Sequence, residues 1–312
     1  MQDRARHDPG SGFGPPKYPG TFLQAFREAA ALLHLDIRRW LGTAVECADE
    51  RGRNLVIGLE NLYRLARRHE REEWPRLIGD FMRTAGVSDA DAELTEALAS
   101  VGDRLLPRLG LPLESLPASA QVWSQSLAET GLCVNLVIDR QKTFHYVTAE
   151  AINESGKDGP AWFEQAMANL RARTPADCFE VIDEESGLRL CAVGDAFDSS
   201  RALLLDTLLP EGAGDGFFVA VPARDCVLAV PVNAQALGFV HLLKVLAEKN
   251  FKTSPYSISD RVYWVREGVW RFFCVEVQGQ QATIQPPLEF VEILDRLAPD
   301  KNASDLIEPS DN

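Results

Sequence analysis

Pairs of short strand-like segments, each joined by a polar turn and followed by one helical pattern, constrain the fold of this chain most strongly. The pairs in the second half are 178–182 with 188–193, 217–221 with 226–230, and 261–265 with 270–277. Strands joined by short turns pair antiparallel. We therefore predict an α+β fold, with mainly antiparallel sheets of paired strands that alternate with helices packed on one face. The first half also has a hairpin followed by helices, which is compatible with an internal structural duplication.

Changes in composition divide the chain into five parts. Residues 1–20 are polar and rich in Pro and Gly, and residues 299–312 are polar and acidic, so we expect disordered tails at both ends. The stretch 110–130 contains prolines among several Ser and Gln residues. We interpret it as a loop or linker between an N-terminal α+β unit, 21–109, and a C-terminal α+β unit, 131–298.

Apolar spacing predicts individual elements of the first half. Apolar residues recur at helical spacing over 21–41, which predicts one helix there. Segments 44–47 and 54–57 flank a polar, Gly-containing stretch and predict a hairpin. Segment 104–109 is strand-like, but Pro107 cannot donate a hydrogen bond to a neighbouring strand. We therefore place this strand at the edge of a sheet.

Three short polar signatures at the ends of apolar segments supply the candidate site residues. They are Asn169 with Arg171 at the end of a helical pattern, Asp195 with Asp198 and Arg201 before a second helix, and Arg224 with Asp225 between two strands.

Each signature has a structural interpretation and a ligand-binding one. If Asp198 caps the helix that follows, its carboxylate accepts from an exposed N–H group, and Arg201 is close enough to pair with it. Arg224 and Asp225 would then form a turn, and Arg171 would complement a helix dipole. In the alternative, the seven residues form a ligand site in which a helix N-terminus and arginines face an anion.

The order and spacing of several segments resemble a known family. The segments are 137–139, 143–147, 165–171, 198–201, 219–228 and 262–268. They resemble an uncharacterised bacterial family, catalogued as domain of unknown function 1444, which includes the YtpQ-like proteins. The resemblance covers roughly residues 44–278 and is strongest from 131 onward. It supports the fold prediction and implies no activity, ligand or catalytic residue.

Charge and apolar content limit the classes of partner. The net charge is −14, and an acidic surface repels phosphate backbones, so we expect no nucleic-acid partner. No apolar run reaches the roughly 18 residues of a membrane helix, and no apolar export segment is visible. We therefore expect a cytoplasmic protein with no membrane partner. The six cysteines have no metal-binding spacing, and we expect reduced, buried thiols.

One local run opposes the overall negative charge. Residues 51–83 hold eight arginines interleaved with five acidic residues. This pattern is typical of a solvated helix face with ion pairs, and it is also compatible with a docking patch for an acidic partner.

Short catalytic motifs are missing from the sequence. It has no nucleophile elbow, no phosphate-binding loop, no dinucleotide fingerprint and no paired metal-ligating histidines. We expect no cofactor, no catalytic residue and no metal ligand. Aromatic residues cluster over 263–273, where one face fills a core and an exposed face would suit protein recognition.

These observations favour a non-enzymatic module that binds a protein or a small molecule. The alternative is an enzyme, or an anion- or metal-binding site, built on the Asp/Arg cluster of the second half. The sequence leaves the identity of the partner and the oligomeric state open.

Overall fold

The structure is a computed structural model that describes residues 18–42, 44–50, 52, 54–84, 98–113, 121–140, 144–212, 214–254, 256–278 and 281–297. Its helices and antiparallel sheets confirm the predicted α+β class. The predicted tail 299–312 and most of the tail 1–20 lie outside these residues.

Two compact units interleave along the chain. One comprises Met1–Val101, Leu113–Val122 and Ile138–Gly156, and the other comprises Gly102–Pro112, Trp123–Val137 and Lys157–Asn312. This division differs from a single predicted break at 110–130. The reason is a long-range strand pairing, described below, that places residues 102–112 in the second unit.

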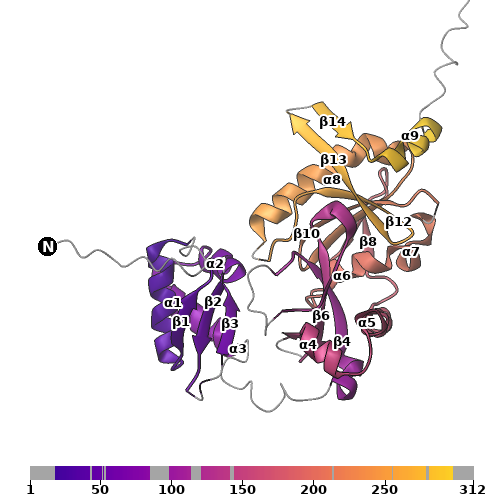
Figure 1. Ribbon diagram of the computed structural model, residues 1–312. Coiled ribbons are helices and arrows are strands. Elements are labelled where there is room, and N and C mark those ends of the chain that lie inside the picture. Colours follow the sequence, from indigo (N-terminus) through magenta and orange to yellow (C-terminus); the bar gives the residue numbers. More distant parts are fainter. Residues whose placement is uncertain are drawn as a thin grey trace, which may run out of the picture. The chain divides into compact units, whose positions relative to one another are not determined.

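The first unit contains a three-stranded antiparallel sheet with helices packed against it (Figure 1). Its elements are α1 (Gly20–Leu32), β1 (Asp36–Trp40), β2 (Ala44–Ala48), β3 (Asn54–Gly58), α2 (Glu60–Ala66), a 3-10 turn (Arg71–Glu73) and α3 (Trp74–Thr84). The β2–β3 hairpin confirms the prediction for 44–57.

The prediction of one helix over 21–41 is wrong in its second half. Helix α1 ends at Leu32, and His34 has a φ of 54°, a left-handed conformation that a helix cannot continue through. Residues 36–40 then form strand β1, which pairs with β2. Trp40 fits the helical spacing only by coincidence. Its side chain reaches the same core as α1, but from a strand.

The core of the first unit is aromatic and aliphatic. Phe22 and Phe26 of α1 are fully buried together with Leu62 and Ile78. Tyr18 joins them, with its ring 5.5 Å from Phe22 and 5.3 Å from Tyr63 between centroids. Tyr18 therefore belongs to this core, although it lies within the predicted tail of residues 1–20.

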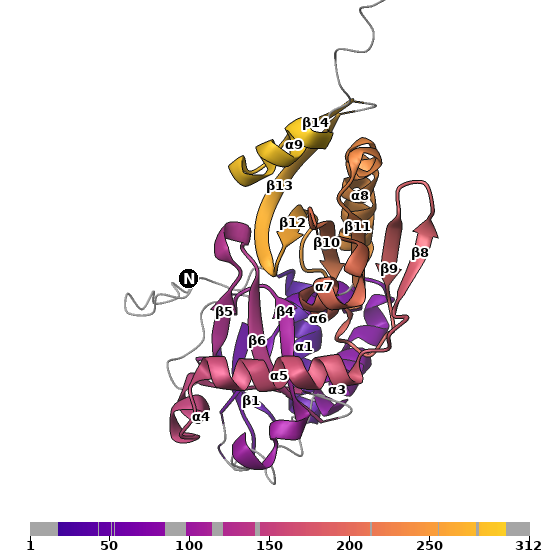
Figure 2. The same ribbon diagram turned by 90° about the vertical axis from the view of Figure 1, so that its right-hand side faces the viewer.

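A second sheet has four strands, in the order β4-β6-β5 with β7 also paired with β6. The elements of this part are β4 (Leu105–Gly110), β5 (Ser124–Ser126), β6 (Cys133–Asp139), β7 (Phe144–Tyr146), α4 (Ala149–Glu154) and α5 (Gly159–Arg173). Strand β4 lies at the edge, as Pro107 predicts. Helix α5 packs against β4 and runs across the strands of this sheet (Figure 2). Asp158 caps this helix by accepting from the Ala161 N–H at 2.9 Å.

The largest sheet has seven strands in the order β14-β13-β12-β10-β11-β9-β8. Its strands are β8 (Phe179–Asp183), β9 (Leu188–Cys191), β10 (Phe217–Ala223), β11 (Cys226–Pro231), β12 (Val262–Arg266), β13 (Val269–Gln278) and β14 (Gln281–Gln285). The helices of this part are α6 (Asp198–Arg201), α7 (Leu205–Leu208), α8 (Ala234–Thr253) and α9 (Val291–Leu297). All three predicted hairpins are present.

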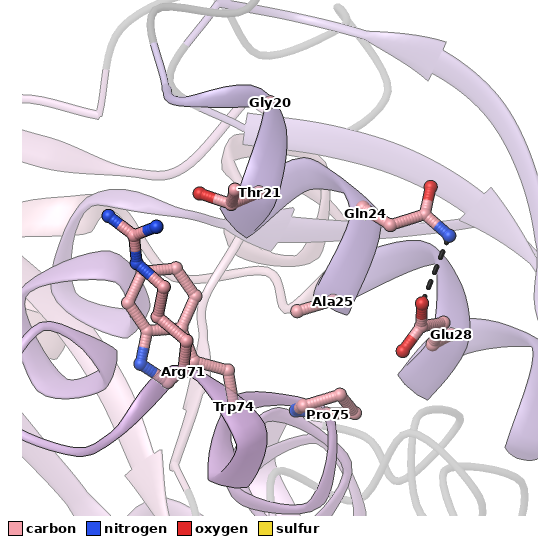
Figure 3. Close-up of a pocket in the computed structure, with 8 residues that line it drawn as sticks. All are labelled: Gly20, Thr21, Gln24, Ala25, Glu28, Arg71, Trp74 and Pro75. Atoms are coloured by element: carbon pink, nitrogen blue, oxygen red, sulfur yellow. Dashed lines mark hydrogen bonds between the residues drawn. The ribbon is translucent and has the colours of Figure 1, made fainter.

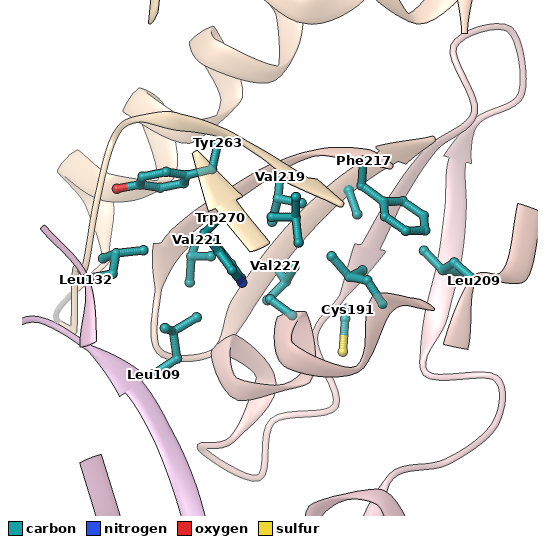
Figure 4. Close-up of a cluster of buried hydrophobic side chains, with 14 of the residues drawn as sticks. Leu109, Leu132, Cys191, Leu209, Phe217, Val219, Val221, Val227, Tyr263 and Trp270 are labelled. Atoms are coloured by element: carbon teal, nitrogen blue, oxygen red, sulfur yellow. The ribbon is translucent and has the colours of Figure 1, made fainter. Parts of the chain in front are cut away.

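Both faces of this sheet are covered, and helices contribute to both. The long helix α8 and the short α9 pack on one face, over a core that contains Phe218 and Phe273. The other face carries a second core, where Val219 and Trp270 meet Leu109 of β4 (Figure 4). The prediction that helices pack on one face therefore describes α8 and α9 but not α7, whose Leu205 belongs to the second core. The described sheets of three, four and seven strands do not confirm an internal duplication.

Candidate functional site

Asp195, Asp198 and Arg201 come together where the loop after β9 enters α6. Gly194 and Ala196 both have positive φ, 85° and 71°, so the loop doubles back before the helix. This turn places both carboxylates against the same guanidinium. Arg201 is 0% exposed and is one of the largest fully buried side chains in the described chain.

The Arg201 guanidinium is bound on two sides by acidic groups. Its Nη1 and Nη2 donate to Oδ1 and Oδ2 of Asp195 at 2.8 and 2.7 Å, which is a bidentate pair. Nη1 also donates to Oδ1 of Asp198 at 2.8 Å, so the predicted Asp198–Arg201 pairing is confirmed. Only Nε lacks a hydrogen-bond partner among the residues that the structure describes.

The prediction that Asp198 caps its helix is wrong. Phe197 occupies the cap position of α6, and no side chain caps the helix there. The Asp198 carboxylate instead turns back and accepts from the N–H groups of Val193 at 2.9 Å and Gly194 at 2.8 Å. These donors precede the helix, so Asp198 closes the loop.

Electrostatics reinforce the same arrangement. Burial opposes ionisation of Asp195, but hydrogen bonds from Arg201 and from the Phe197 N–H outweigh it, and the pKa of this carboxyl lies below its ordinary value. Burial likewise opposes the charge on Arg201, while Asp195 and Asp198 raise the pKa of the guanidinium. Arg173 adds an outer contact, with Nε 3.3 Å from Oδ2 of Asp195.

The two serines of α6 join this loop to neighbouring strands. Ser200 Oγ accepts from the Leu109 N–H at 3.1 Å, and Ser199 Oγ donates to the Leu109 carbonyl at 3.3 Å. The Ser199 N–H donates to the Arg224 carbonyl at 3.0 Å. Both serines are buried, so the first turn of α6 holds β4 and the β10–β11 turn together.

The other predicted residues have separate surroundings. Asn169 Nδ2 donates to the carbonyls of Gly102 at 2.7 Å and Leu105 at 2.8 Å, which fastens α5 to the start of β4. Arg171 is exposed in the last turn of α5. Arg224 and Asp225 form the turn between β10 and β11. The Arg224 guanidinium stacks on the ring of Tyr256, with its Cζ atom 3.6 Å from the ring centroid.

The structure therefore brings together three of the seven candidates. Arg201 and Asp198 have fully buried side chains, and Asp195 is 21% exposed, so the pair of carboxylates has little access to a ligand. No group of three or more His, Cys, Asp or Glu side chains with metal-binding geometry occurs in the described part of the chain.

An open groove lies elsewhere, in the first unit, between α1 and the start of α3 (Figure 3). Its volume is about 360 Å³, and it is lined by Gly20, Thr21, Gln24, Ala25, Glu28, Arg71, Trp74 and Pro75. Arg71 and Trp74 lie on one side of the opening, and Gln24 and Glu28 lie on the other, joined by a 3.0 Å hydrogen bond. Trp74 and Ala25 are buried, so the floor of the groove is apolar.

Sequence reasoning missed this groove and a pair of thiols, Cys178 and Cys191. The groove depends on how α1 packs on α3, and apolar spacing within either helix gives no sign of it. The thiols carry a weak signal, because they lie at the start and the end of the predicted 178–193 hairpin and so fall near each other in its register.

Comparisons with known proteins identify no relative of this chain. No family model, no curated protein and no solved structure matches the chain significantly. Among the described helices, none combines the length and apolar character needed to cross a membrane.

Proposed function

We propose that this protein is a non-enzymatic binding module that receives a segment of a partner protein in the groove between α1 and α3. The observation that carries the proposal is the groove itself, an open depression with an apolar floor and charged side chains on opposite rims. Small-molecule sites enclose most of their ligand, whereas this depression is open along one side. Its form suits one or two side chains of a protein segment.

The lining indicates the chemistry of that segment. Trp74 and Pro75 offer a flat apolar surface, and aromatic residues in shallow pockets are frequent anchors of protein recognition. Arg71 is exposed on the rim and can bind a carboxylate with two parallel hydrogen bonds. A segment with an apolar side chain next to an acidic one fits best, and this favours the docking interpretation of the arginine-rich run.

The Asp/Arg cluster supports the alternative function less well. Its guanidinium donors are already bound within the loop, and its serines are engaged by backbone groups. An anion would have to displace Asp195 from a bidentate pair before it could bind. The ligand-binding role of Asn169, Arg171, Arg224 and Asp225 stays a prediction.

The cellular setting is part of the same proposal. A net charge of −14 and reduced thiols favour a cytoplasmic protein that binds no nucleic acid. Membership of the family of unknown function 1444 also stays a prediction from the ordered segments of the sequence.

Site-specific crosslinking tests the binding function. A photo-crosslinking residue in place of Gln24, which is exposed on the rim, should capture a defined protein in the native host. The same residue in place of Thr207, exposed on α7, should not capture it. The captured protein is then purified, and its affinity for the whole chain is measured by calorimetry.

Charge reversal and filling of the groove decide whether the groove is the binding surface. Arg71→Glu and Thr21→Trp should each weaken binding by about tenfold, or ~1.4 kcal/mol. Arg76→Glu is the matched control, because Arg76 is exposed on α3, five residues from Arg71, and does not line the groove. Unchanged affinity in both test variants would reject the proposal.

A further inference from the structure

Two thiols from opposite ends of the β8–β9 hairpin lie against each other. Cys191 ends β9 and is the register partner of Phe179, the residue directly after Cys178. Register partners in antiparallel strands lie about 5 Å apart between Cα atoms, and Cys178 is one residue further along, which puts its Cα roughly 6 Å from that of Cys191, within the range of a disulfide bond. Cys178 lies just before β8 begins, so the alternation of side chains along the strand does not fix the direction of its thiol. The two side chains belong to one buried cluster, and the thiols interact electrostatically with each other.

The two cysteines differ in access to solvent. Cys178 follows an exposed turn at residues 175–177 and is 7% exposed, whereas Cys191 is 0% exposed. A small reagent can therefore reach Cys178 first. Cys191 lies behind it as the second thiol.

Their surroundings also differ in charge. The neighbouring Cys191 thiol lowers the pKa of Cys178 despite its burial, and the Arg201 cation acts in the same direction, whereas the Asp198 carboxylate opposes it. The same contact and burial raise the pKa of Cys191, whose Sγ lies 3.7 Å from Oδ1 of Asp198. Cys178 is thus the better nucleophile of the pair, and Cys191 keeps its proton.

We propose that Cys178 and Cys191 form a reversible oxidation site that reacts with hydroperoxides and closes as an intrachain disulfide bond. The Asp195–Asp198–Arg201 cluster then acts as the positioning element for this thiol pair. This inference is independent of the proposed binding groove, which lies in the other unit.

The reaction balances with one hydroperoxide. The Cys178 thiolate attacks an oxygen of the O–O bond, so an S–O bond forms, the O–O bond breaks, and the departing oxygen takes a proton to leave as water or an alcohol. The sulfur now carries a sulfenic acid. Cys191 then loses its proton and attacks that sulfur, an S–S bond forms, and hydroxide leaves with the proton as water. Two thiols lose two electrons in total, and the peroxide gains them.

Peptide mapping of the whole protein tests the site. The reduced protein is treated with hydrogen peroxide, its remaining thiols are alkylated, and it is digested with trypsin without reduction. Cleavage after Arg173, Arg189 and Arg201 places Cys178 in peptide 174–189 and Cys191 in peptide 190–201. We expect these two peptides linked, with the loss of two hydrogen atoms, and we expect dithiothreitol to separate them.

Serine variants assign the two roles. Cys191→Ser should stop at the sulfenic acid of Cys178, which a 1,3-dione reagent captures, and Cys178→Ser should form no disulfide bond. Cys274→Ser is the control, since Cys274 is more exposed than Cys178 and should not affect the linkage.

Two results would overturn the proposal. One is full alkylation of Cys178 after peroxide treatment. The other is a disulfide bond that joins a different pair, such as Cys191 with Cys226. Both are read from the wild-type protein, so the test does not depend on whether the variants fold.

Discussion

At the scale of single residues, the loop between β9 and α6 shows how three charged side chains can satisfy one another inside the protein. Asp195 and Asp198 neutralise the guanidinium of Arg201, which is wholly buried. Two backbone N–H groups also donate hydrogen bonds to the carboxylate of Asp198. Removing one partner from a buried ion pair leaves the other charge unsatisfied, which costs far more than losing a surface pair.

Replacement of Asp198 by alanine measures this difference. Asp198→Ala should lower the free energy of unfolding by about 3 kcal/mol, because Arg201 and two N–H groups lose an acceptor. Asp158→Ala is the matched control: Asp158 is a genuine helix cap, and its loss should cost about 1 kcal/mol. Urea denaturation gives both values. Equal effects would contradict the assignment of Asp198 to a buried ion pair.

The lowered pKa of Asp195 predicts a specific acid sensitivity. A carboxyl with a lowered folded-state pKa stabilises the fold above its unfolded pKa, and this contribution is lost as the pH falls through the folded-state value. Wild-type protein should therefore lose more thermal stability between pH 7 and pH 3 than Asp195→Asn, which cannot titrate. Melting temperatures across this pH range check the prediction.

At the scale of elements, the hairpins could be predicted from sequence because each combines short apolar runs with a polar turn. Segment 36–40 could not, since its spacing continues that of α1 and only the left-handed His34 separates them. The proximity of Asp198 to Arg201 follows from their spacing. The direction of the Asp198 carboxylate does not, because it depends on the positive φ of Ala196, a conformation that alanine seldom adopts.

The glycine-containing loop before β10 offers a prediction at this scale. Gly216 has a φ of 85°, and a Cβ there would lie 2.3 Å from the Val265 carbonyl oxygen. Gly216→Ala should therefore destabilise the protein by more than about 2 kcal/mol. Gly214→Ala, two residues earlier, meets nothing within 4 Å and should change stability by less than about 0.5 kcal/mol. Thermal denaturation compares the pair, and similar effects would contradict the assigned conformation.

At the scale of the whole molecule, the pairing of β4 with β6 is the feature that local patterns could not reveal. It brings Leu109 into a core whose other members lie beyond residue 130. A single linker at 110–130 is the simplest interpretation of the composition, but it assigns β4 to the wrong side of the break.

Fragments of the chain test this assignment. A fragment of residues 102–297 keeps β4 and should unfold in one cooperative transition. A fragment of residues 121–297 keeps β5 but lacks β4 and the Leu109 backbone groups that bind Ser199 and Ser200, so we expect a broad transition at a lower temperature. Circular dichroism during heating measures both. Equal cooperativity would show that β4 is dispensable for this unit.

The interleaving of the two units also governs the order in which the protein can mature on the ribosome. The chain passes between the units five times, and the first unit receives its last segment only at Gly156. Domains ordinarily fold one after another as they emerge during synthesis. The first unit is complete only when half of the 312 residues have left the exit tunnel, and the second only when nearly all of them have. We therefore expect early nascent chains to need protection by chaperones.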